Sequence, residues 1–224
     1  MKKSAHPYHY SEDKSIVQKV VDFGVPLGLF LIYLQFYNFS GTEISSFAYN
    51  FGKITPSEMV KTTGLMAIFL LSLTLAIGPL CRFFPFLNDL KAHRKVWGIL
   101  SFLFAFIHMS LIFIFFYKFN LLKFVDFSNP RYPGILAGIL SLIILFVVTI
   151  TSTKKALTTL SPQVWKALQT TAYLALALAI IHFYLIESKD GVLVIQKLLG
   201  QITFGFAGLV IFLRLIVSFI PVKK

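Results

Sequence analysis

Six stretches of this 224-residue chain are each long and apolar enough to cross a lipid bilayer. An α-helix rises about 1.5 Å per residue, so ~20 apolar residues span a hydrocarbon core of ~30 Å. The breaks between the stretches carry proline, glycine, asparagine and charge, as connecting segments should. We therefore predict six transmembrane helices, at residues 20–39, 64–81, 97–117, 134–152, 169–187 and 198–220.

The composition indicates the same class of protein. Hydrophobic residues make up 57% of the chain and charged residues 13%, with a mean hydropathy of +0.78. A soluble helical bundle would need polar faces repeating every ~3.6 residues, and these stretches have none. We predict an all-α, six-helix bundle in a bacterial inner or plasma membrane. A polar tail at 1–18 would precede a membrane domain at 19–224.

Basic residues predict the orientation of this bundle. Thirteen Lys and Arg flank the spans on the side that carries both termini, and seven flank the other side. The positive-inside rule then places both termini in the cytoplasm. The net charge of +12 follows from these short loops, so we expect lipid and no nucleic acid as a partner. Arg214 lies inside the sixth span, where either snorkelling to the interface or a buried anionic partner explains it.

Two of the five histidines lie well inside apolar spans, in FAFIHMSL and AIIHFYLI. His108 of the third span and His182 of the fifth fall at a similar depth, whereas His6 and His9 lie in the polar tail. An ionisable residue inside a membrane points to function, and two facing imidazoles suit bis-axial ligation of a haem iron. The alternative is that each imidazole only hydrogen-bonds a neighbouring carbonyl or hydroxyl. Zinc or copper suits the pair less well, because the spans offer no third ligand at that depth.

Several short motifs occur in a characteristic order around these histidines. They are Gly78-Pro79-Leu80 with Arg82, Arg94-Lys95-x-x-Gly98 ten residues before His108, Arg131-Tyr132-Pro133, Thr151-Ser152, Trp165-x-x-Leu168 and His182-Phe183. Over residues 62–187 the chain thereby resembles the ferric reductase-like transmembrane family. Within that family it is most similar to the haem-binding membrane subunits of bacterial periplasmic methionine sulfoxide reductase systems.

The resemblance implies a function and a cofactor. His108 and His182 would be the axial ligands of a b-type haem, and so the ligands of its iron. The chain would be an electron-transfer subunit of an oxidoreductase system rather than a complete enzyme. Its donor would be a cytoplasmic flavin reductase or a membrane quinol. Its acceptor would lie outside the cytoplasm, either a partner reductase such as a methionine sulfoxide reductase or a small molecule such as ferric iron.

The cytoplasmic ends of the third and fifth spans depart from the two-haem members of the family. Those members carry a second histidine pair where this chain has Arg94 and Gln169, so we expect one haem. His93 lies ~22 Å below His108 on the helix, with Gln169 as its counterpart. Together with Arg94 and Arg214 it suggests a pocket for propionates, a flavin phosphate or a quinone head group. The alternative is that these cations are only the positive-inside signature.

Two further expectations complete the sequence reading. Lys118, Arg131 and Lys189 are candidate partners for the propionates of a haem in the outer half of the membrane. The competing function is a cofactor-free transporter or an assembly subunit. The spans lack the chain of acids and the broken-helix pair that a transporter would use, and we find no internal repeat of the inverted-repeat kind.

Overall fold

Among the residues that the computed structural model describes, 15–36, 54–189, 192–195 and 197–219, six helical segments can span a membrane. This confirms the prediction of a multi-pass helical membrane protein. The tail residues 1–14, with His6 and His9, lie outside the described part. The six segments are α1 (Ile16–Phe36), α2 (Pro56–Phe83), α3 (Arg94–Leu111) continued by the π-helical turn η3 (Ile112–Phe116), α4 (Tyr132–Thr151), α6 (Pro162–Thr170) continued by α7 (Ala172–Glu187), and α8 (Leu198–Phe219).

The connecting segments hold more structure than the sequence predicts. The intervals expected to be loops at 82–96 and 153–168 contain short helices, because Pro85 and Pro162 suit the first turn of a helix. α2 begins eight residues before its predicted start, where Thr55 and Glu58 form a reciprocal capping box. The short elements are η2 (Pro85–Ala92), η4 (Leu121–Phe124), α5 (Lys154–Thr159) and the antiparallel strands β1 (Ser188–Lys189) and β2 (Val192–Leu193).

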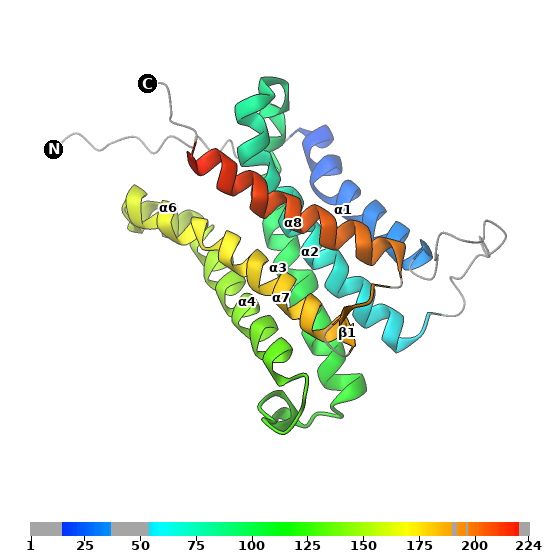
Figure 1. Cartoon of the computed structure of the whole chain (residues 1–224). Helices are drawn as coiled ribbons and strands as arrows, with labels where there is room; N and C mark the ends of the chain where they lie inside the picture. Colours follow the sequence, from blue (N-terminus) through cyan, green and yellow to red (C-terminus); the bar gives the residue numbers. More distant parts are fainter. Residues whose placement is uncertain (1–14, 37–53, 190–191, 196, 220–224) are drawn as a thin grey trace.

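α2 lies at the centre of the bundle, with the other spans arranged around it (Figure 1). Its buried Leu71 and Leu75 belong to one core cluster with Leu145 of α4, Leu176 of α7 and Val210 of α8. The opposite face of α2 packs against α1 and α3 through a second cluster that includes Met66 and Leu70. Side chains from five neighbouring helices belong to these two clusters, so α2 is the helix around which the candidate site is built.

Two antiparallel helix pairs, α2 with α3 and α4 with α7, make equivalent contacts at positions that differ by a constant offset in the sequence. Ser101 of α3 donates to the carbonyl of Ala67 in α2 at 2.8 Å. In the second pair Ser141 of α4 donates to the carbonyl of Ala175 in α7, also at 2.8 Å. Positions 67 and 101 thus correspond to 141 and 175, an offset of 74 residues at both. Donor and acceptor are exchanged between the two pairs, so the residue types differ at these equivalent positions.

Candidate functional site

His108 lies in the last turns of α3 and is held by the backbone of α2. Its Nδ1 is 2.7 Å from the carbonyl oxygen of Val60. A carbonyl only accepts, so Nδ1 carries the hydrogen and donates it. In the neutral imidazole this leaves the lone pair on Nε2, the nitrogen that points away from α2. The backbone therefore orients the ring and fixes its tautomer.

His182 of α7 is held in the same way by α4. Its Nδ1 is 2.8 Å from the carbonyl oxygen of Gly134, in the first turn of that helix. In both helix pairs the histidine follows its carbonyl partner by 48 residues. The two histidines and their two partners keep the offset of 74 residues seen for the serines. The site is thus a repeated unit, with one imidazole from each pair.

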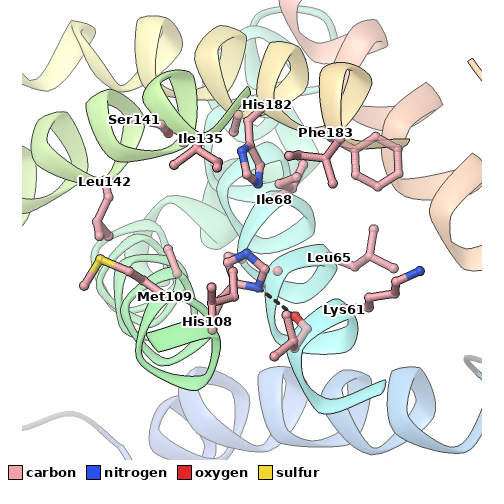
Figure 2. A pocket seen from close by; sticks show the side chains of 18 of the residues that line it. Lys61, Leu65, Ile68, His108, Met109, Ile135, Ser141, Leu142, His182 and Phe183 are labelled. Atoms are coloured by element: carbon pink, nitrogen blue, oxygen red, sulfur yellow. Dashed lines mark hydrogen bonds between the residues drawn. The ribbon is translucent and has the colours of Figure 1, made fainter. Parts of the chain in front are cut away.

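The two imidazoles face one another across the centre of the four helices. Their ring centres are 6.1 Å apart and the ring planes are nearly perpendicular, at 83°. Figure 2 shows the second nitrogen of each ring turned toward the other ring. The structure thus brings together the two histidines that the sequence analysis paired. The chemical consequence is a pair of opposed lone pairs, suited to two ligands on opposite sides of one metal ion.

Two glycines let the imidazoles lie against the neighbouring helices. A Cβ atom at Gly64 of α2 would lie 2.9 Å from Nδ1 and Cε1 of His108. A Cβ at Gly138 of α4 would lie 2.7 Å from Nδ1 of His182. Each glycine follows the residue that supplies the carbonyl by four positions, one helical turn. The sequence analysis missed both, although Gly134-x-x-x-Gly138 is a pattern that permits close helix approach in membranes.

A cavity of about 770 Å³ surrounds the two rings. Its volume lies within the range of ~300–1,000 Å³ that is usual for small-molecule and cofactor sites. Most of the lining is apolar, with Leu71 of α2 and Leu145 of α4 at its deep end. The charged residues lie at the mouth, beside the ends of the helices that carry the histidines. They are Lys61, Arg131, Glu187 and Lys197.

The opposite end of the core holds the arginines that the sequence marked. We call it the arginine end, and the end with His108 and His182 the histidine end. Arg94 Nε donates to the carbonyl of Thr74 at 3.1 Å. The guanidinium of Arg214 lies over the ring of Tyr173, 5.1 Å from its centre, and the Tyr173 hydroxyl donates to the carbonyl of Leu75. Both arginines therefore gather around Tyr173, which the sequence analysis did not single out.

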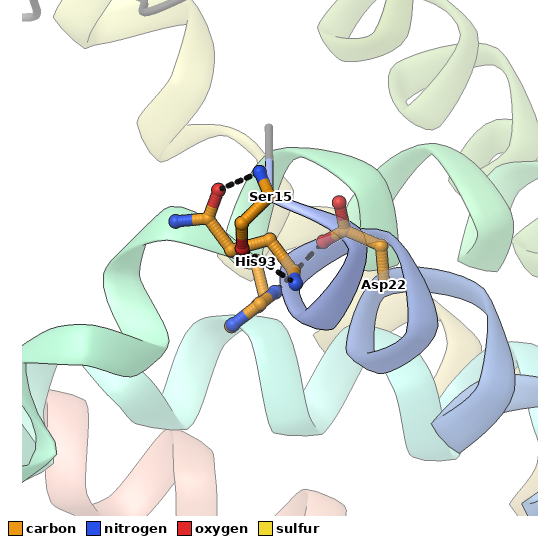
Figure 3. A network of polar contacts seen from close by, with 4 residues as sticks. Ser15, Asp22 and His93 are labelled. Carbon is orange, nitrogen blue, oxygen red and sulfur yellow. Dashed lines mark hydrogen bonds and ion pairs between the residues drawn. The ribbon is translucent and has the colours of Figure 1, made fainter. Parts of the chain in front are cut away.

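Gln169 and His93 are not brought together, although the sequence made them counterparts. The Gln169 amide donates to the carbonyl of Val148 at 3.2 Å, on the α4 side of the core. His93 turns the other way, toward α1, where its Nδ1 is 2.8 Å from Oδ1 of Asp22 (Figure 3). Its ring stacks on Trp97, with centres 5.5 Å apart. His93 therefore belongs to a buried hydrogen-bonded pair that links α1 to the start of α3.

Asp22, a buried carboxylate that the sequence analysis did not single out, also lies at this end. It is 1% exposed, in a helix whose other residues are mostly apolar. The available signal was a lone carboxylate inside an apolar span, which by itself calls for a cationic or hydrogen-bonding partner. Among the described residues, no group of three or more His, Cys, Asp or Glu side chains could hold a metal ion.

Comparison with known proteins identifies the family of the chain. The family described as "ferric reductase like transmembrane component" matches residues 63–180, just over half of the chain. The chain is also 29% identical over 130 residues to the protein-methionine-sulfoxide reductase heme-binding subunit MsrQ of Herminiimonas arsenicoxydans. That match covers 58% of this chain and 59% of the relative. The resemblance inferred from the sequence motifs is confirmed.

Proposed function

The chain belongs to the ferric reductase-like transmembrane family, and on this basis we propose that it binds one haem b between His108 and His182 and carries electrons across the membrane. The observation that supports this most strongly is the opposed pair of imidazoles. A metal–imidazole bond is about 2 Å and the ring centre lies ~1.1 Å beyond its nitrogen, so two imidazoles on one iron have centres ~6.2 Å apart. The measured separation is 6.1 Å.

The surroundings of the two rings also suit axial ligation. A histidine that ligates a metal through one nitrogen usually donates its other N–H to a carbonyl or carboxylate, which fixes the ring and increases its basicity. Val60 and Gly134 supply those carbonyls here. The absence of a Cβ at Gly64 and Gly138 allows each ring to lie close to its neighbouring helix. The mostly apolar lining of the cavity gives the rest of the site a low-dielectric surrounding.

A haem in this cavity supplies one-electron redox chemistry. The residues of the chain contribute ligation, orientation and a low-dielectric surrounding, which are the protein's means of setting the potential. The arginine end supports a single haem, because Arg94 and Gln169 stand where two-haem members carry histidines. Their side chains are already hydrogen-bonded to the backbone of α2 and α4.

We propose that electrons enter at the arginine end and leave at the histidine end. The excess of basic residues in the loops of the arginine end supports a cytoplasmic position for it. The donor would then be a cytoplasmic flavin reductase or a membrane quinol. The name of the MsrQ relative supports a methionine sulfoxide reductase as the acceptor, with ferric iron as the small-molecule alternative.

The visible spectrum of the full chain, purified in detergent after expression with ample haem, tests this function. We expect a Soret band with sharp α and β bands on reduction, and one haem per chain. His108→Ala and His182→Ala should each abolish the bands, whereas His93→Gln, at the other end of α3, should keep them. A wild-type protein without Soret absorption would falsify the proposal. A ratio near two haems per chain would overturn the argument from Arg94 and Gln169.

A further inference from the structure

We infer that Lys61, Arg131 and Lys197 bind the two carboxylates of the haem, so that its propionate edge points out of the histidine end. This inference rests on the proposed function and assigns the orientation of the cofactor within the same cavity. The macrocycle is otherwise free to enter with its carboxylates toward the mouth or toward the deep end. Charge decides between the two orientations.

The charges that line the cavity match a dianion. Among the residues that the structure describes, three cations and one carboxylate stand at the mouth: Lys61, Arg131, Lys197 and Glu187. Cations therefore exceed carboxylates in this described lining, and two propionates carry negative charge. The deep end is lined by aliphatic side chains such as Ile68, Leu71 and Leu145. Carboxylates turned that way would lose their hydration without gaining a cation, which is the costlier arrangement.

The cations stand at the level of the histidines because the same helix ends position both. Lys61 follows Val60, whose carbonyl holds His108. Arg131 is the residue just before α4 and lies three positions before Gly134, whose carbonyl holds His182. One cation from each helix pair therefore flanks the mouth, and Lys197 adds a third at the start of α8. The equivalent ends of α2 and α4 supply both the imidazole partners and the cations.

Glu187 already places a carboxylate beside one of these cations. Its Oε1 is 3.7 Å from Nζ of Lys61, and the two side chains are 29% and 47% exposed. Ion pairs with such exposure contribute little free energy, so an exchange of carboxylate partners costs little. Glu187 therefore marks a carboxylate position at the mouth and competes with a propionate for Lys61.

This assignment changes the set of cations that the sequence suggested. Arg131 is retained, whereas Lys118 is not among the residues that line the cavity. The side chain of Lys189 lies outside the described residues. Lys118 and Lys123 belong to the same end of the molecule and do not line the cavity, which makes them matched controls.

The test compares haem with its dimethyl ester, in which both carboxylates are neutral. The full chain, purified in detergent without haem, is titrated with each compound and followed at the Soret band. The variant Lys61→Gln/Arg131→Gln/Lys197→Gln should bind haem about tenfold more weakly than wild type, the scale of losing charge-assisted hydrogen bonds at a partly exposed site. Its affinity for the ester should stay within about twofold of wild type. Lys118→Gln/Lys123→Gln should change neither affinity.

Two further readouts separate carboxylate binding from a merely structural role. Glu187→Gln removes the competing carboxylate, so haem affinity should rise by about twofold, with no rise for the ester. In the triple variant the midpoint potential of the bound haem should move to more negative values, because lost cations disfavour the reduced, more negative form. Equal loss of haem and ester affinity, or no loss of either, overturns the orientation. If wild type binds neither compound, the proposed function itself fails.

Discussion

The two ends of the four-helix core are built on the same backbone register and differ in what their side chains do. At the histidine end each helix pair supplies a carbonyl, a glycine one turn later and a histidine, so the two halves are equivalent. At the arginine end the carbonyls of Thr74 and Val148 again differ by 74 positions and each accepts a side-chain donor. The donors there are Arg94 and Gln169, which are neither alike nor offset by 74.

Under the proposed function, this difference explains why a repeated scaffold would hold one haem instead of two. At the histidine end, the imidazoles lie close against Gly64 and Gly138, and a cavity surrounds the two rings. Long polar side chains and Tyr173 occupy the equivalent space at the arginine end, where they hydrogen-bond to backbone carbonyls. The register determines where a site can form, and the size and chemistry of the side chains determine whether it does.

We expect the largest effect when a substitution adds a single methyl group beside a histidine at the histidine end. Gly138→Ala places a Cβ about 2.7 Å from Nδ1 of His182, and Gly64→Ala places one 2.9 Å from His108. Overpacking of this kind costs about 1–3 kcal/mol and displaces the ring from its carbonyl, so most haem should be lost. Haem per chain is the measurement. Gly98→Ala is the control, because its Cβ would meet Thr74 Cγ2 at an ordinary 3.6 Å; equal haem content in all three variants would contradict the assignment.

The next effect breaks the buried pair of His93 and Asp22 at the arginine end. Asp22→Asn leaves His93 without its buried carboxylate, and loss of one partner from such a pair costs about 3–5 kcal/mol. Thermal unfolding in detergent should show a large decrease in Tm, while the folded protein keeps its haem spectrum. The double variant Asp22→Asn/His93→Gln should lose less than the sum of the single variants, since the two side chains act together. Loss of the Soret band in folded Asp22→Asn protein would show that the two ends are not independent.

A smaller effect tests whether Arg94 supports the fold or a second cofactor. Arg94→Ala removes the hydrogen bond to the Thr74 carbonyl and should lower the free energy of unfolding by about 1–3 kcal/mol. Haem content and the Soret maximum should not change, since Arg94 lies at the far end of α3 from His108. Arg94→Lys, which keeps the charge but not the Nε donor, serves as the comparison. A second spectroscopic species lost in Arg94→Ala would argue for a cofactor at this end.

The smallest expected effect tests whether the two helix pairs are equivalent in stability. Ser101→Ala and Ser141→Ala each remove one hydrogen bond of 2.8 Å to a backbone carbonyl. Such bonds between membrane helices contribute about 0.6 kcal/mol on average, so both variants should show small and similar decreases in stability. The two unfolding curves, measured under one detergent condition, are the test. A difference above ~1 kcal/mol would mean that one pair carries more of the packing than the repeat implies.

Several parts of the site could be predicted from sequence, and the reasons are local. His108 and His182 stand out because an ionisable group in an apolar span is rare. Their depth follows from counting residues along a helix of known rise. The carbonyls of Val60 and Gly134 could not be predicted, because every residue carries a carbonyl and only packing decides which one meets an imidazole. The glycines at 64 and 138 could not be predicted for the same reason, because their role depends on which imidazole packs against them.

The sequence by itself determined the class of the protein, the number of its spans and the pair of histidines at one depth. These follow from hydrophobicity and helix rise, which depend only on neighbours along the chain. The tertiary structure decided the rest: that His93 turns to Asp22 and away from Gln169, that the arginines gather around Tyr173, and that two helix pairs share a register. Each of these depends on the rotation and approach of helices far apart in the chain, which side-chain volume and hydrogen-bond partners set only once the bundle has formed.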